Sequence, residues 1–226
     1  MVDVYLEIGD KRVFAGALDW PGWCRSAKDA DGALQALVEY APRYAKVLRR
    51  KKIPFKSPKD VSALHVVERL EGDATTDFGA PGAPPKFDAN PVDKRQLARL
   101  EKFLQASWAA LDSAAKAARG KELRKGPRGG GRSLAKIVEH VVGADHGYLT
   151  RIGGKHRGGD ETDPAKLKAF RATIIEALGA SARGEVPRKG PRGGARWSPR
   201  FFVRRSVWHV LDHAWEIEDR IDGPAT

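Results

Sequence analysis

Apolar and polar side chains alternate at the start of the chain. In residues 2–8, one side of the backbone carries Val2, Val4, Leu6 and Ile8, and the other carries Asp3, Tyr5 and Glu7. This period of two predicts a half-buried β-strand. A turn at Gly9-Asp10 and a second strand over residues 12–18 complete a predicted hairpin, which the run 19–22 (DWPG) ends. Residues 61–70 (VSALHVVERL) predict a further strand.

The period changes to that of a helix after the hairpin. Asp29 or Asp31 is suited to cap a helix whose apolar stripe recurs every three or four residues up to Leu48. Pro42 lies inside this stripe and predicts a kink or a break. The basic run 49–52 follows, where cations favour the negative end of the helix dipole.

Residues 72–93 show no period and are rich in Gly, Pro and Ala. This composition predicts an interdomain linker that its four prolines hold rather extended. The predicted division is therefore a β-β-α-β domain (1–71), a linker (72–93) and a C-terminal domain (94–226). The predicted fold class is α+β.

The C-terminal domain shows four amphipathic patterns. The first runs from Leu97 to Ala115, and the others cover residues 133–152, 164–180 and 199–221. Pro164 and Pro199 suit the first turns of the last two helices. Four helices of this length predict a four-helix bundle.

The net charge of +12 indicates a surface that attracts anions, such as nucleic acid, acidic lipid, phosphate or carboxylate ligands. Cys24 is the only cysteine, which excludes an internal disulfide and a zinc site with several thiolates. The start of the chain has no secretion signal, and no apolar run approaches the roughly 20 residues that span a bilayer. We therefore expect a cytoplasmic protein without a membrane partner.

One sequence repeats within the C-terminal domain. Residues 124–132 read RKGPRGGGR and residues 188–196 read RKGPRGGAR. Both segments are either solvated loops or anion and substrate sites, in which glycine N–H groups assist basic side chains near a helix N-terminus. The candidate residues are Arg124, Lys125, Arg128, Arg132, Arg188, Lys189, Arg192 and Arg196. Neither copy has the Gly-Lys-Ser/Thr order of a P-loop.

Two histidines on the last helix suggest metal chemistry. His209 and His213 are four apart and therefore share a face. His140 lies at the edge of the buried stripe of the second helix, so the three can face one pocket. Three imidazoles leave a coordination position open, as in catalytic zinc sites. The alternative is a chance spacing of histidines on a surface helix.

The roles of other polar residues near this pocket are not decided by the sequence. His146 points away from the stripe, although the choice between His140 and His146 depends on helix register. Glu216 shares the side of His213 and is a candidate catalytic base or a partner of a ligand. Asp212 is interpreted as a solvated charge.

Residues 1–70 resemble the HicB-like antitoxin fold. The resemblance rests on the hairpin that runs into DWPGWC (19–24) and on the Ala-rich helix from Asp31. It implies an interaction module with a degraded ribonuclease-H-like fold. No set of carboxylates here indicates a working nuclease.

Residues 95–222 resemble the DinB/YfiT-like family of metal-dependent four-helix bundles. The resemblance rests on SLAKIVEHVVGADHGYL (133–149) and on WHVLDHAWEIEDRI (208–221). It implies that His140, His209 and His213 bind a divalent metal such as zinc or nickel. Characterised members include transferases and isomerases that use low-molecular-weight thiols such as mycothiol or bacillithiol, so the resemblance implies a thiol-dependent transferase or a related metalloenzyme.

Two functions are thus predicted. The first is this metalloenzyme, with a small anionic or thiol substrate. The alternative is a non-enzymatic regulatory protein whose HicB-like domain binds a protein partner while the basic loops contact nucleic acid. Trp197 is the only aromatic residue beside the loops and no nucleic-acid-binding signature is present, so the first is favoured. A homodimer is left open.

Overall fold

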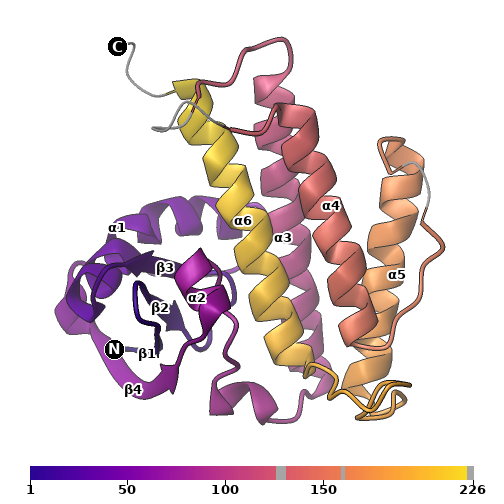
Figure 1. The fold of residues 1–226 in the computed structure, drawn as a ribbon, viewed down its shortest axis with the longest axis horizontal. Helices are drawn as coiled ribbons and strands as arrows, with labels where there is room; N and C mark the ends of the chain where they lie inside the picture. Colours follow the sequence, from indigo (N-terminus) through magenta and orange to yellow (C-terminus); the bar gives the residue numbers. More distant parts are fainter. Residues whose placement is uncertain (126–130, 159–160, 223–226) are drawn as a thin grey trace.

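The structure is a computed structural model that describes residues 1–125, 131–158 and 161–222. A small sheet forms the N-terminal part and helices form the rest, which confirms the predicted α+β class (Figure 1). None of the helices in these ranges combines the length and the hydropathy needed to cross a membrane.

The sheet has four strands in the order β3-β2-β1-β4. The bounds are Val2–Ile8 for β1, Val13–Ala17 for β2, Cys24–Ala27 for β3 and Leu64–Glu71 for β4. β1 pairs with β2 antiparallel and with β4 parallel. The predicted hairpin and last strand are confirmed. β3 was not predicted, because its sequence CRSA is short and has no alternating pattern.

β1 is covered on both faces, so the prediction of a half-buried strand was wrong. Tyr5 and Glu7, on the side predicted to be polar, are as buried as Val4 and Leu6 on the other. The Glu7 carboxylate is satisfied by the Thr76 hydroxyl at 2.6 Å and by the backbone N–H groups of Gly82 and Ala83. A buried charged group needs such donors, and here the segment after β4 supplies them.

The segment predicted as an extended linker therefore packs against the sheet. It contains helix α2 (Ala74–Phe78) and a short 3₁₀ helix (Lys86–Ala89). Asp73 and Thr76 form a reciprocal capping box that starts α2. The sequence did not predict these elements, because the segment is rich in Gly, Pro and Ala. The domain boundaries drawn from this segment stay a prediction.

Helix α1 (Ala30–Arg49) lies against β2 and β3. Asp29 caps it by accepting a hydrogen bond from the N–H of Gly32. The helix continues through Pro42, so the predicted break is wrong. Ala41 and Tyr44, on either side of Pro42, are fully buried, and this packing offsets the local cost of the proline.

Four long helices follow, as predicted. They are α3 (Lys94–Ala118), α4 (Leu134–Arg151), α5 (Pro164–Ala182) and α6 (Pro199–Asp222). α6 packs extensively on α3 and also contacts α4 and α5. It lies between these helices and the N-terminal sheet (Figure 1). This central place buries most of α6, including its two histidines.

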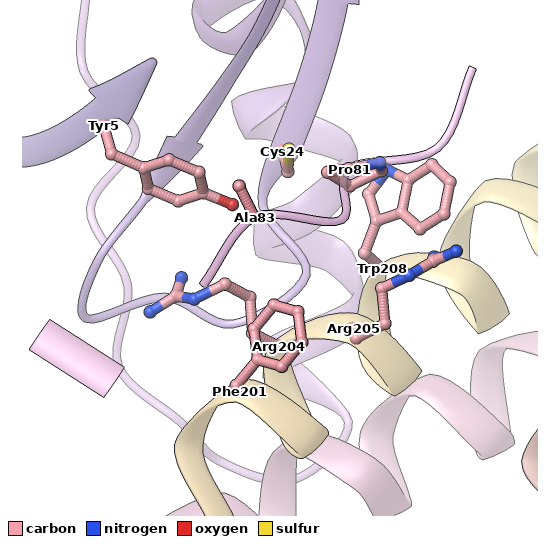
Figure 2. A pocket seen from close by; sticks show the side chains of 8 residues that line it. All are labelled: Tyr5, Cys24, Pro81, Ala83, Phe201, Arg204, Arg205 and Trp208. Carbon is pink, nitrogen blue, oxygen red and sulfur yellow. The ribbon is translucent and has the colours of Figure 1, made fainter. Parts of the chain in front are cut away.

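One continuous hydrophobic core joins the sheet, α1 and the long helices. Where the sheet, the segment after α2 and α6 meet, Tyr5, Cys24 and Trp208 are among the residues around a cavity of about 10 Å³ (Figure 2). Such a cavity holds about one water molecule at most, so this junction is well packed.

Candidate metal centre

His140 of α4 and His209 and His213 of α6 converge. One donor atom from each of the three side chains lies within 4.8 Å of the other two. The Nε2 atoms of His140 and His209 are 3.2 Å apart. Ligands at 2.0–2.1 Å from a tetrahedral zinc ion lie roughly 3.4 Å from one another. The cluster therefore has the donor type and the spacing that a divalent cation requires.

The phase of α4 explains which histidine takes part. Ile137, Val141, Asp145 and Leu149 form its buried stripe, which leaves His140 at the edge of the stripe that faces α6. His146 lies elsewhere, stacked on Phe170 with ring centroids 4.0 Å apart and with its Nε2 atom 3.2 Å from Glu161. The geometry thus brings His140, and not His146, to the pair on α6.

Burial and neighbouring positive charge keep the imidazoles of His140 and His209 neutral. Burial, followed by the charges of His213 and Arg205, lowers the pKa of His209 to about 2. Burial, followed by His213 and Arg132, also lowers the pKa of His140. A metal ion binds neutral imidazole, so no proton needs to be displaced from these two side chains at neutral pH.

Glu216 contacts one of the histidines directly. Its Oε2 atom lies 2.7 Å from Nδ1 of His213, and its Oε1 atom accepts a hydrogen bond from Arg220 at 3.0 Å. The hydrogen bond from His213 lowers the pKa of Glu216, which therefore stays ionised. The carboxylate holds the His213 ring so that Nε2 is the nitrogen left for a ligand bond. The sequence left Glu216 open as a catalytic base or as a partner of a ligand, and the contact with His213 is consistent with the second role.

Asp212 points away from this cluster. Its carboxylate pairs with Arg25 of β3 at 3.0 Å. It therefore joins α6 to the sheet, whereas the sequence suggested a charge in solvent.

The described part of the first basic repeat and the second repeat lie at opposite ends of the long helices (Figure 1). In the first repeat, the N–H of Arg124 donates to the carbonyl oxygen of Arg220, and the Arg220 guanidinium donates to the carbonyl oxygen of Arg132. These bonds attach the loop to the end of α6. Lys125 is exposed, and Arg128 lies outside the described residues.

The second repeat folds back on itself beside the end of α4. Lys189 and Ala195 form an isolated β-bridge, and the N–H of Arg196 donates to the carbonyl oxygen of Arg188. The Arg196 guanidinium donates to the Thr150 carbonyl oxygen, while Arg192 lies on a nearby cavity wall. The basic residues of the two repeats that the structure describes thus do not share one site.

Two residues near the histidines were not singled out from the sequence. The Tyr148 ring centroid lies 5.8 Å from that of His209, and the Arg205 guanidinium lies over the Tyr148 ring at 5.4 Å. Tyr148 follows His140 by eight residues, about two turns along α4 and on the same broad side of the helix, which is a signal that could have indicated it.

Comparison with known proteins supports the C-terminal assignment. The family model of the DinB superfamily matches residues 104–217, a range that contains all three histidines. No curated protein and no solved structure matches the chain. The resemblance of residues 1–70 to HicB-like antitoxins gains no support, because the matched range begins in α3. The match covers half of the chain, and the protein therefore belongs to the DinB superfamily.

Proposed function

We propose that the protein binds a divalent metal ion through His140, His209 and His213 and acts as a thiol-dependent transferase or a related metalloenzyme. The observation that carries the proposal is the convergence of three imidazole donors within 4.8 Å of one another in a DinB superfamily chain. Zinc and nickel are the metals considered, because both accept imidazole nitrogen.

The three histidines leave room for a further ligand at the ion. When bound, such a cation supplies Lewis acidity that lowers the pKa of a coordinated water or thiol. The surrounding residues have separate tasks. Glu216 fixes the ring of His213, and Arg220 fixes Glu216. The positive charge of Arg132, which is close enough to lower the pKa of His140, favours an anionic substrate.

Metal analysis of the untagged protein tests the first half of the proposal. We expect about one zinc or nickel ion per chain in the wild type and loss of most of it in His209→Ala, because two imidazoles bind such ions far more weakly than three. His65→Ala is the matched control, since His65 lies on β4 and pairs with Asp3. A wild-type protein that binds neither metal would contradict the proposal.

The role of Glu216 gives a finer test. Glu216→Gln removes the charge that orients His213, and we expect its metal affinity to fall about 10- to 100-fold in a chelator competition assay. Full occupancy at excess metal is expected, because the three nitrogens remain. An unchanged affinity would remove Glu216 from the site.

The thiol half of the proposal is tested separately. Metal-loaded protein is incubated with a low-molecular-weight thiol and a panel of electrophiles, and thioether formation is followed by mass spectrometry. His209→Ala is the control. If metal binds and no thiol reacts, the metal site stands and the transferase assignment fails.

A further inference from the structure

We propose that the cavity between the end of α4 and the second basic repeat binds a small organic anion that carries an aromatic ring. This inference deepens the proposed function, on which it rests for the reaction, because it names the substrate class. The cavity measures about 770 Å³, within the range of pockets that enclose small ligands. Its walls come from residues 147–151 of α4 and residues 190–197 of the loop.

All the charged side chains described on the cavity walls are positive. Arg151, Arg192 and Arg196 lie on its walls, and no Asp or Glu occurs among the described residues that line it. The Arg196 guanidinium is held by the Thr150 carbonyl oxygen at 3.0 Å, and its buried Nε atom has no hydrogen-bond partner among the described residues. Planar guanidinium groups recognise carboxylate and phosphate oxygens, so the cavity is suited to an anion.

Two aromatic rings lie on the same walls. The centroids of Tyr148 and Trp197 are 5.2 Å apart, and Trp197 also makes an edge contact with Phe201 at 5.0 Å. The Arg151 guanidinium lies 5.8 Å from the Trp197 ring. These contacts fix the rings, and a fixed aromatic face favours a ligand ring beside it. A bare inorganic anion would leave these faces unused.

The wall of the cavity adjoins the metal centre. Tyr148 borders the cavity on one side, and its ring centroid lies 5.8 Å from that of His209. Arg205 extends over the same tyrosine, and its buried Nη1 atom has no hydrogen-bond partner among the described residues. A ligand in the cavity is therefore separated from His209 by a single side chain.

The loop keeps its shape through its own hydrogen bonds. The N–H of Gly190 donates to the Gly194 carbonyl oxygen at 2.8 Å, and the N–H of Trp197 donates to the Arg151 carbonyl oxygen at 3.0 Å. Gly193 has a φ of +80°, which favours glycine. The described part of the first repeat instead attaches to the end of α6. The two copies thus have different structural roles.

Calorimetric titration with phenyl phosphate tests the inference. Inorganic phosphate and phenol serve as the two halves of the probe. We expect phenyl phosphate to bind saturably and at least about tenfold more tightly than inorganic phosphate or phenol. The reason is that its phosphate contacts the arginines while its ring contacts the aromatic side chains. The titration is repeated on protein stripped of metal with a chelator, where binding persists if the cavity holds the ligand.

Two variants locate the site. Gly147→Trp fills the cavity, since a Cβ at Gly147 meets nothing within 4 Å, and we expect it to abolish binding. Arg192→Glu reverses a wall charge and is expected to weaken binding about tenfold or more. Arg119→Glu makes the same change in net charge beyond the far end of α3 and is expected to leave binding within about twofold.

Several results would overturn the inference. They are absence of saturable binding, equal affinity for inorganic phosphate, loss of binding on metal removal, or equal weakening by Arg119→Glu. Metal content is measured for each protein. Binding of phenyl phosphate by a wild type without metal affinity would sink the proposed function and leave the cavity site standing, whereas the reverse pattern would sink the cavity site alone.

Discussion

At the scale of single residues, Asp145 has a carboxyl group that is buried inside the helical bundle. It is buried between α4 and α3, where the Trp108 indole N–H donates to its Oδ2 atom at 3.3 Å. Burial raises the pKa of Asp145 to about 7, although the Trp108 hydrogen bond and the charge of Arg171 act to lower it. The folded protein therefore holds a proton here that the unfolded chain releases near pH 4.

Asp145→Asn is expected to change how stability depends on pH. Between about pH 4 and pH 7 the folded wild type binds this proton and the unfolded chain does not, so wild-type stability falls as pH rises. Asparagine is neutral and keeps an oxygen for Trp108. The free energy of unfolding of the variant minus that of the wild type should rise by about 2–4 kcal/mol from pH 4 to pH 8. Urea titrations across this range measure it, and a constant difference would contradict the buried acid.

The histidine cluster was predictable at the residue scale because it depends on helical phase. The 100° step per residue is a property of the backbone, so His140, His209 and His213 could be placed from sequence alone. Glu216 was found for the same reason. The choice between its two candidate roles was not predictable, because it depends on the side-chain conformation that meets His213 and Arg220.

At the scale of elements, two glycines differ in whether a neighbouring element leaves room for a side chain. Gly143 lies on the exposed side of α4, and a Cβ there meets nothing within 4 Å. Gly22, in the turn before β3, has a φ of +87°, and a Cβ there would overlap the Val207 side chain of α6. A larger residue could therefore replace Gly143 in α4. The close packing of the turn against α6 requires a glycine at position 22.

The two glycine-to-alanine variants should therefore shift stability in opposite directions. Gly143→Ala is expected to stabilise the protein by about 0.5–1 kcal/mol, because alanine loses less backbone entropy in a helix. Gly22→Ala is expected to destabilise it by about 2 kcal/mol or more, from the positive φ and the overlap with α6. Urea unfolding of both variants gives the comparison. A stable Gly22→Ala variant would show that the turn does not pack closely on α6.

The elements that the sequence did not predict are those that tertiary contacts define. β3 forms because CRSA pairs with β2, and it has too few residues to show a period. α2 has a capping box at Asp73 and Thr76 that could have been noticed within the Pro/Gly-rich segment. The long helices and the hairpin carry their patterns over many residues, and their bounds were accordingly close.

At the scale of the whole molecule, Arg204 joins three parts of the chain. Its guanidinium makes two hydrogen bonds to Asp88 at 2.7 Å and donates to the carbonyl oxygens of Ala17 and Leu18. Both charged side chains are almost fully buried, at 5% and 1% exposure. Strand β2, the segment before α3 and helix α6 therefore share one charged contact inside a continuous core.

Removing this arginine tests whether the parts unfold together. Arg204→Met leaves the Asp88 charge buried without its partner, and we expect a loss of about 3–5 kcal/mol in urea unfolding. Arg200→Met is the matched control, because Arg200 lies one turn earlier and donates to the carbonyl oxygens of Asn90 and Pro91 from a partly exposed position. We expect that control to lose about 1 kcal/mol.

Adding Asp88→Asn to Arg204→Met separates the charge from the packing. The neutral amide removes the uncompensated charge, so the double variant should regain part of the lost stability. Because one core spans the sheet and the helices, the wild type should unfold in a single transition seen alike by circular dichroism and tryptophan fluorescence. If Arg204→Met costs no more than Arg200→Met, or the wild type unfolds in two steps, the sheet and the helical bundle are independent units. The charged contact would then be incidental to their association.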